Sequence, residues 1–156
     1  MELRELWLIL HILGAIAAFG FGFTAPIFGS MVAREPQHGN WYLRAVKRVS
    51  DFVIIPVALS MLVTGILLVA ATGGFSMFQQ LWLALSLVIY IAAMIAVFAV
   101  QRPTIIRVIE LTGAPPGPGG PPPEVPALIG RLRLVGLGLT VAVIVIVYLM
   151  VAKPVL

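Results

Sequence analysis

Four long apolar segments limit the fold of this chain more than any other feature of its sequence. They cover roughly residues 6–32, 52–71, 78–100 and 134–152, and each has about the 20 apolar residues that a helix needs to cross a bilayer. The chain is 61% hydrophobic and 10% charged, whereas a soluble domain carries roughly a quarter of its residues as charges. Backbone groups in lipid must be hydrogen-bonded within their own segment, which favours helices. The sequence therefore predicts an all-α polytopic membrane protein, a four-transmembrane-helix bundle that forms a single domain over residues 1–156.

The basic residues are concentrated in two of the connections between these segments. Of the ten Lys and Arg residues, eight lie in segments 33–51 and 101–133, and only Arg4 and Lys153 lie near the termini. Basic loops are retained on the cytoplasmic side of a membrane. We therefore expect a multi-pass protein of the inner (cell) membrane with both long connections in the cytoplasm. The N and C termini and the uncharged turn 72–80 are expected outside.

The two basic connections differ in character. The first contains the run NWYLRAVKRV, in which two aromatic residues stand beside three bases: Trp41, Tyr42, Arg44, Lys47 and Arg48. This pattern is typical of a helix at the membrane interface, and equally of a simple extension of the second span. The second connection contains the Pro/Gly tract 113–126, which is predicted to hold neither a helix nor a sheet ladder and to form an extended cytoplasmic tether.

A single histidine, His11, interrupts the first apolar segment. Small residues follow it on the same helical face: Gly14, Ala15, Ala18, Gly22, Ala25 and Gly29. Such a stripe lets another helix approach closely, so His11 is expected to face protein rather than lipid. Thr64, Ser86 and Tyr148 lie at a similar depth in the other spans. With His11 they form a candidate polar cluster in the outer half of the bundle.

Several kinds of chemistry find no support in the sequence. Cysteine is absent, which excludes disulfides and thiolate sites. No carboxylate lies within a span, which argues against a path for protons or cations. No phosphate-binding loop or Ser-His-Asp set is present, so no catalytic residue or metal-ion site is predicted and enzyme activity is disfavoured. Membrane orientation, rather than nucleic-acid binding, explains the net charge of +4.

His11 is also compatible with a b-type haem, which needs one or two axial imidazoles inside a bundle. His38 lies on the opposite side of the membrane, so a bis-histidine haem would require a symmetric dimer. Alternatively, the iron would be five-coordinate or would take Met61 or Met94 as a ligand. The competing interpretation is a buried, hydrogen-bonded histidine without a cofactor.

Several short motifs, taken in order, resemble a known bacterial family. They are LHILGA at residues 10–15, the entry residue Asp51, LVTGILL in the second span, LWLALSL in the third and YLMVAKP near the C-terminus. Together they resemble the predicted integral membrane proteins of domain of unknown function 2269, a name that implies no activity. The start Leu-His-x-Leu-Gly is more remotely similar to copper-resistance D-like membrane proteins and HemJ-like protoporphyrinogen oxidases. That similarity implies a haem or metal ligand at His11.

Three functions are compatible with these features. The first is a small non-catalytic accessory or scaffolding component of a membrane assembly, either a homo-oligomer or a larger complex in the lipid bilayer. The second is a b-type haem- or metal-binding membrane protein in redox or haem metabolism, with His11 as axial ligand. The third is a carrier of small molecules or lipids.

Overall fold

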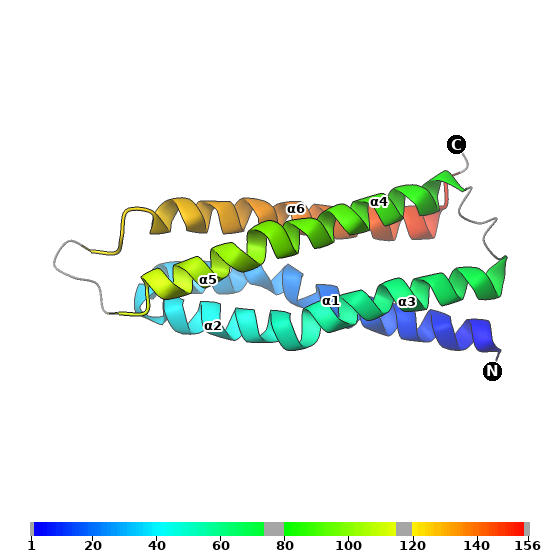
Figure 1. Ribbon diagram of the computed structural model, residues 1–156, viewed down its shortest axis with the longest axis horizontal. Helices are drawn as coiled ribbons and strands as arrows, with labels where there is room; N and C mark the ends of the chain where they lie inside the picture. Colours follow the sequence, from blue (N-terminus) through cyan, green and yellow to red (C-terminus); the bar gives the residue numbers. More distant parts are fainter. Residues whose placement is uncertain (1, 74–79, 115–119, 155–156) are drawn as a thin grey trace.

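Four helical rods run side by side along the long axis of the molecule (Figure 1). The computed structural model describes residues 2–73, 80–114 and 120–154. All four rods are long and apolar enough to cross a membrane. In chain order the helical elements are α1 (Leu3–Arg34), η1 (Pro36–His38), α2 (Gly39–Val49), η2 (Ser50–Ile54), α3 (Ile55–Thr72), α4 (Leu81–Ala96), η4 (Val97–Gln101), α5 (Arg102–Leu111) and α6 (Val125–Ala152). The prediction of an all-α bundle with four spanning helices is confirmed.

The rods extend well beyond the apolar segments. α1 has 32 residues and is about 48 Å long, against a hydrocarbon core of about 30 Å. α2 continues into η2 and α3 with helical backbone throughout, so it is an extension of the second span rather than a separate helix. Much of 101–133 is likewise helical, in α5 and in the first turns of α6.

The predicted tether is shorter than expected at its C-terminal end. α6 begins at Val125, so Val125 and Pro126 are helical and the expectation of no helix over 113–126 is wrong there. Proline is tolerated in a first helical turn because its missing N–H would have had no intrahelical partner. The fourth helix also begins before residue 134, the predicted start of its span. Residues 115–119 of the tract, and residues 74–79 of the predicted outer turn, lie outside the described residues.

The second and third rods each contain a π-helical turn before a proline. η2 precedes Pro56 and η4 precedes Pro103, and each π segment starts six residues before its proline. Ile55 and Arg102, the residues before the prolines, each donate a backbone hydrogen bond to the carbonyl five residues earlier. A proline ring clashes with the carbonyl four residues before it and has no N–H to donate. The wider π turn accommodates that ring within a continuous helix.

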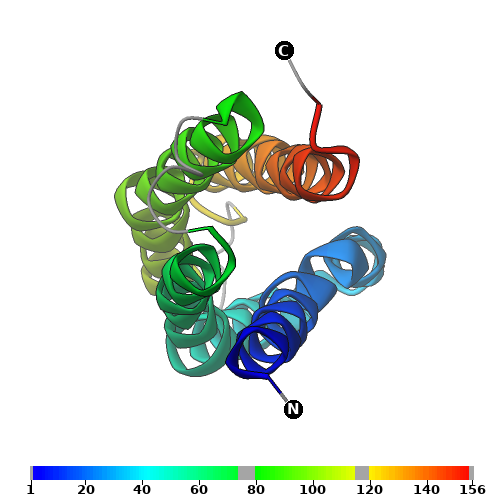
Figure 2. The same cartoon turned by 90° about the vertical axis from the view of Figure 1, so that its right-hand side faces the viewer.

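Packing between the rods is mainly pairwise, although Val69 of α3 joins the cluster between α4 and α6. α1 packs on α3 through a cluster of Ala18, Ala58 and Met61, and α4 packs on α6 through a cluster that includes Trp82 and Leu149. α2 contacts α5, which places the second and third rods side by side at the end near the tether. Contact between α1 and α6 is slight. Seen end-on, the helices form an incomplete ring that is open between α1 and α6 (Figure 2).

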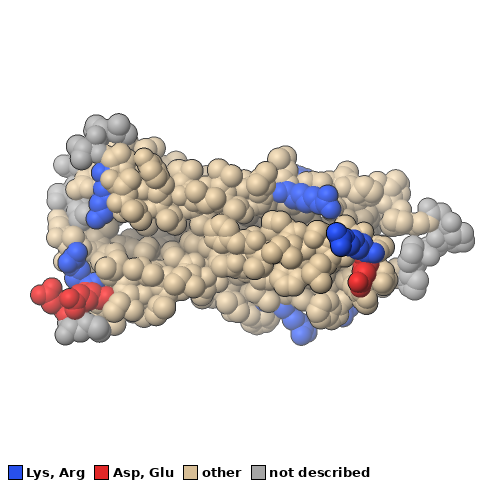
Figure 3. Space-filling model, turned by 180° about the vertical axis from the view of Figure 1, so that it is seen from behind, with Lys and Arg blue, Asp and Glu red and all other residues tan. Residues whose placement is uncertain are grey.

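Large apolar side chains cover the outside of the molecule. Phe52 is 80% exposed and Val151 is 79% exposed, whereas Val108 in α5 is only 1% exposed. On the face in Figure 3 the charged residues gather toward the two ends and leave an uncharged band between them. An apolar band of this kind requires lipid around it. The structure is therefore that of an integral membrane protein.

Replacing Ala18 by leucine tests the close contact between α1 and α3. Ala18 is 4% exposed, so a larger side chain would push the two helices apart. We expect Ala18→Leu to lower the free energy of unfolding by about 1–3 kcal/mol, measured by thermal unfolding in detergent. Ala17→Leu adds the same atoms at the neighbouring exposed position and should change it by less than about 0.5 kcal/mol. Equal effects of the two variants would contradict the orientation of α1, in which Ala18 is buried against α3 and Ala17 is exposed.

Candidate functional site

His11 on α1 is held against α3 by a hydrogen bond to Thr64. Nδ1 of His11 lies 3.0 Å from Oγ1 of Thr64, and the same hydroxyl donates to the carbonyl oxygen of Met61 at 3.2 Å. A hydroxyl has only one hydrogen to donate, so Thr64 accepts from the Nδ1–H of His11. In the neutral ring this arrangement leaves the lone pair on Nε2.

Two glycines allow α1 and α3 to approach at this level. A Cβ atom on Gly65 would lie 3.2 Å from Cε1 of His11, closer than ordinary van der Waals contact. A Cβ atom on Gly14 would lie 2.9 Å from Cγ of Met61. Small residues at such crossings are the usual packing device of membrane helices. The ring of His11 therefore lies against the backbone of α3.

The structure brings together two of the four residues proposed as a polar cluster. His11 and Thr64 are in contact, but Ser86 donates to the carbonyl of Trp82 in its own helix, at 2.7 Å. Tyr148 is 63% exposed and makes no hydrogen bond among the described residues. Similar depth in the membrane did not imply a shared face, because depth says nothing about how each helix is rotated. A cofactor-binding role for any of the four stays a prediction.

The other residues considered as haem ligands are His38, Met61 and Met94. His38 is in η1, near the tether, where its Nε2 lies 3.5 Å from the carboxylate of Glu35. Met61 and Met94 both belong to the packing cluster between the helices. Within the described ranges, no three His, Asp or Glu residues are grouped so that they could hold a metal ion.

The residues predicted to lie at the membrane interface are all on α2. Trp41 is 68% exposed, and the ring of Tyr42 lies 6.2 Å from that of Phe28 on α1. Arg44 and Arg48 are exposed and form no ion pair among the described residues. Their contact with lipid headgroups remains a prediction. Lys47 instead forms an ion pair with Asp51.

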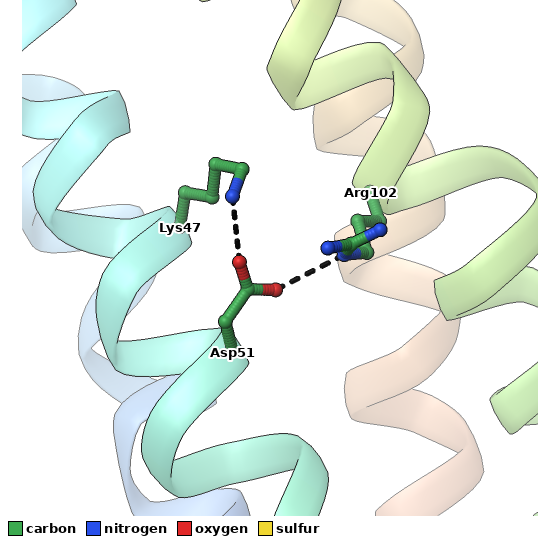
Figure 4. Close-up of polar contacts among 3 residues, drawn as sticks. All are labelled: Lys47, Asp51 and Arg102. Carbon is green, nitrogen blue, oxygen red and sulfur yellow. Dashed lines mark hydrogen bonds and ion pairs between the residues drawn. The ribbon is translucent and has the colours of Figure 1, made fainter.

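Asp51 joins the second rod to the third. Its Oδ2 accepts a hydrogen bond from Nζ of Lys47 at 2.6 Å, and its Oδ1 accepts one from Nε of Arg102 at 3.0 Å (Figure 4). Asp51 is in η2, and Arg102 directly follows η4, so this ion-paired junction lies at both π turns. π turns are frequent at functional sites in helices. We call Lys47, Asp51 and Arg102 the charged junction.

A small polar cavity lies beside the charged junction. Its volume is about 10 Å³, and Gln101 contributes to its wall together with all three junction residues. The side-chain oxygen of Gln101 is buried and has no hydrogen-bond partner among the described residues. A cavity of this size and polarity holds about one water molecule, which would donate to that oxygen.

Sequence reasoning noted Asp51 as an entry residue and missed its role in joining two rods. The spacing of Lys47 and Asp51 places them one helical turn apart, so that pair was open to prediction. Arg102 lies 51 residues further along the chain, and no local pattern relates it to Asp51.

Neutralising Asp51 tests whether the charged junction holds the two rods together. Asp51→Asn removes both ion pairs and leaves Lys47 and Arg102 as unpaired neighbouring cations. Exposed pairs contribute about 0–1 kcal/mol each, so we expect the free energy of unfolding in detergent to fall by about 1 kcal/mol. Glu110→Gln is the control, because Glu110 pairs with Arg107 at 3.8 Å and is well exposed. A larger loss of unfolding free energy in Glu110→Gln than in Asp51→Asn would contradict the role of Asp51 in joining the two rods.

The fold and these contacts define a class: a multi-pass integral membrane protein whose paired helices are joined by polar contacts at several levels. A family model described as "Predicted integral membrane protein (DUF2269)" matches residues 5–154, and the chain belongs to this family. No curated protein and no solved structure matches the chain. The resemblance drawn from the short motifs is thereby confirmed. The remote similarity to copper-resistance D-like and HemJ-like proteins stays a prediction.

Proposed function

We propose that this protein is a small non-catalytic component of a membrane assembly, with an accessory or scaffolding role. It would lie in the inner membrane with its termini outside, as the distribution of basic residues favours. The assembly partner would be a second copy of the chain or a helix of another membrane protein.

The uncovered glycine faces of α1 and α6 carry this proposal. At several glycines of these two helices a Cβ atom would meet no atom within 4 Å: Gly20, Gly22, Gly29, Gly130, Gly136 and Gly138. Glycine inside a helix costs about 1 kcal/mol relative to alanine, and these positions gain no close contact with the described residues in return. Membrane helices approach one another closely where their surfaces carry small residues. α1 and α6 also flank the open side of the incomplete ring of helices seen end-on (Figure 2).

Filling one glycine position tests the proposal. Gly22→Leu should leave the unfolding free energy of the single chain unchanged or raise it by up to about 1 kcal/mol. It should remove the partner, because the added side chain occupies the approach surface. The measurement is the mass of the assembly by size-exclusion chromatography with light scattering, after mild detergent extraction from native membranes.

Two variants control this experiment. Ala17→Leu adds a side chain at an exposed position of α1, and His11→Gln alters the polar contact; both should keep the assembly. A wild-type protein that runs as a single chain without a partner would overturn the proposal, as would full assembly of Gly22→Leu.

A b-type haem protein with His11 as axial ligand is the second candidate. The observation that favours it is the contact between Thr64 and Nδ1 of His11, which leaves Nε2 as a possible ligand. The described residues supply one such imidazole, which fits a five-coordinate iron or an iron shared by two copies. A bound haem would supply redox chemistry, and the protein would hold it through Nε2.

A visible absorption spectrum decides between these candidates. If His11 is an axial ligand, protein purified from haem-supplied cells will show an intense haem band, and His11→Ala will lose it. Ser86→Ala serves as the control, because Ser86 donates only to its own helix. A colourless wild-type preparation would eliminate the haem candidate and leave the assembly proposal standing.

A further inference from the structure

An apolar groove separates α3 from α4. It has a volume of about 370 Å³ and is lined by Leu59 and Leu62 on one side and by Ile91, Ile95 and Phe98 on the other, among others. Tyr90 also contributes, but its hydroxyl donates to the carbonyl oxygen of Ala58 at 2.5 Å and is therefore occupied. The groove is therefore lined by apolar side chains, and the hydroxyl of Tyr90 is not free to bind a ligand.

The groove results from the divergence of the second and third rods. α2 and α5 lie in contact near the tether, whereas α3 and α4 move apart beyond the π turns (Figure 1). The charged junction lies where the divergence begins, because Asp51 is in η2 and Arg102 directly follows η4. Phe98 of the groove precedes Arg102 by about one helical turn. The groove therefore leads from the charged junction into the apolar part of the bundle.

The charged junction favours an anion. It combines two cations with one carboxylate, so its formal charge is positive. Arg102 uses only Nε toward Asp51, and the terminal nitrogens of its guanidinium have no hydrogen-bond partner among the described residues. Its side chain is 44% exposed and that of Lys47 is 32% exposed, so both are accessible. Arg44 and Arg48 add further positive charge on α2.

The distance from the charged junction to the far end of the groove matches one leaflet of a bilayer. Ile91 precedes Arg102 by eleven residues, and Leu62 follows Asp51 by eleven residues on the other rod. Eleven residues of helix rise about 16 Å, and half of a hydrocarbon core is about 15 Å. A lipid with its phosphate at the charged junction would therefore reach the middle of the bilayer with its acyl chain.

We propose that the groove between α3 and α4 holds an acyl chain of an anionic phospholipid whose headgroup phosphate binds Arg102 and Lys47. Basic pockets between membrane helices are suited to such headgroups. The lipid fills the space between the diverging rods, where a zwitterionic lipid would meet uncompensated positive charge. The inference is independent of the proposed assembly, because α3 and α4 do not carry the uncovered glycines.

Binding of defined lipids to the purified protein tests this inference. The probes are phosphatidylglycerol and phosphatidylcholine with identical acyl chains, and glycerol phosphate without acyl chains, each titrated into detergent-solubilised protein and followed by native mass spectrometry. Each unit of positive charge near an anionic headgroup contributes about fivefold in affinity, and the charged junction has a net charge of +1, so it should favour phosphatidylglycerol by about fivefold. Glycerol phosphate should not bind measurably, because it has nothing to place in the groove.

Two variants separate the headgroup from the acyl chain. Arg102→Gln leaves the charged junction neutral and should abolish the preference for phosphatidylglycerol, whereas Arg133→Gln, which changes an exposed arginine of α6, should leave it unchanged. Ala99→Phe adds a large side chain in the groove and should weaken binding of both lipids alike. This second variant keeps the charged junction intact, so it tests the groove even if Arg102→Gln is poorly folded.

Several results would overturn the inference. Equal binding of the two lipids by the wild-type protein would remove the role of the charged junction, as would a full preference in Arg102→Gln. Tight binding of glycerol phosphate would indicate an anion site without a lipid. Unchanged lipid binding in Ala99→Phe together with loss of an associated protein would assign the groove to a helix of that protein.

Discussion

Lipid removes most of the force that gathers apolar side chains in water, so the helices of this protein depend on close approach and on a few polar contacts. The crossing of α1 and α3 illustrates this constraint. Ala18 and Ala58 allow the two backbones to come together, and Gly65 leaves room for the imidazole of His11. The hydrogen bond to Thr64 then fixes the rotation of both helices. Apolar side chains elsewhere remain on the outside, where they contact lipid at no cost.

The same constraint explains how the chain accommodates Pro56 and Pro103 inside its second and third rods. A broken helix would expose unpaired carbonyl groups to lipid, which has no donor to offer them. A π turn keeps each rod continuous while making space for the ring. Asp51 and Arg102 lie at these turns and connect the two rods at one level. Beyond that level α3 and α4 diverge, and the groove between them follows from the divergence.

Of the predicted polar cluster, His11 and Thr64 are in contact, whereas Ser86 and Tyr148 lie apart from them. In the stripe of small residues on α1, Gly14 and Ala18 pack against α3, whereas Gly22 and Gly29 are uncovered. For α6 the sequence holds no comparable cue, since nearly every side chain of that helix is apolar. Ile146 and Leu149 turn toward protein, and Tyr148 consequently points outward. Ser86 is buried, yet the nearest acceptor for its hydroxyl is in its own helix.

Hydrophobic segment length determined the class of this protein, the number of its spanning helices and their approximate positions, because a bilayer of given thickness accepts few other structures. Short motifs were enough to indicate its family. The rotation of each helix, the pairing of Asp51 with Arg102 and the groove beside them were settled by packing between segments far apart in the chain. In a sequence this uniformly apolar, many rotations bury similar surface, and small differences in side-chain volume and a few hydrogen bonds select one of them.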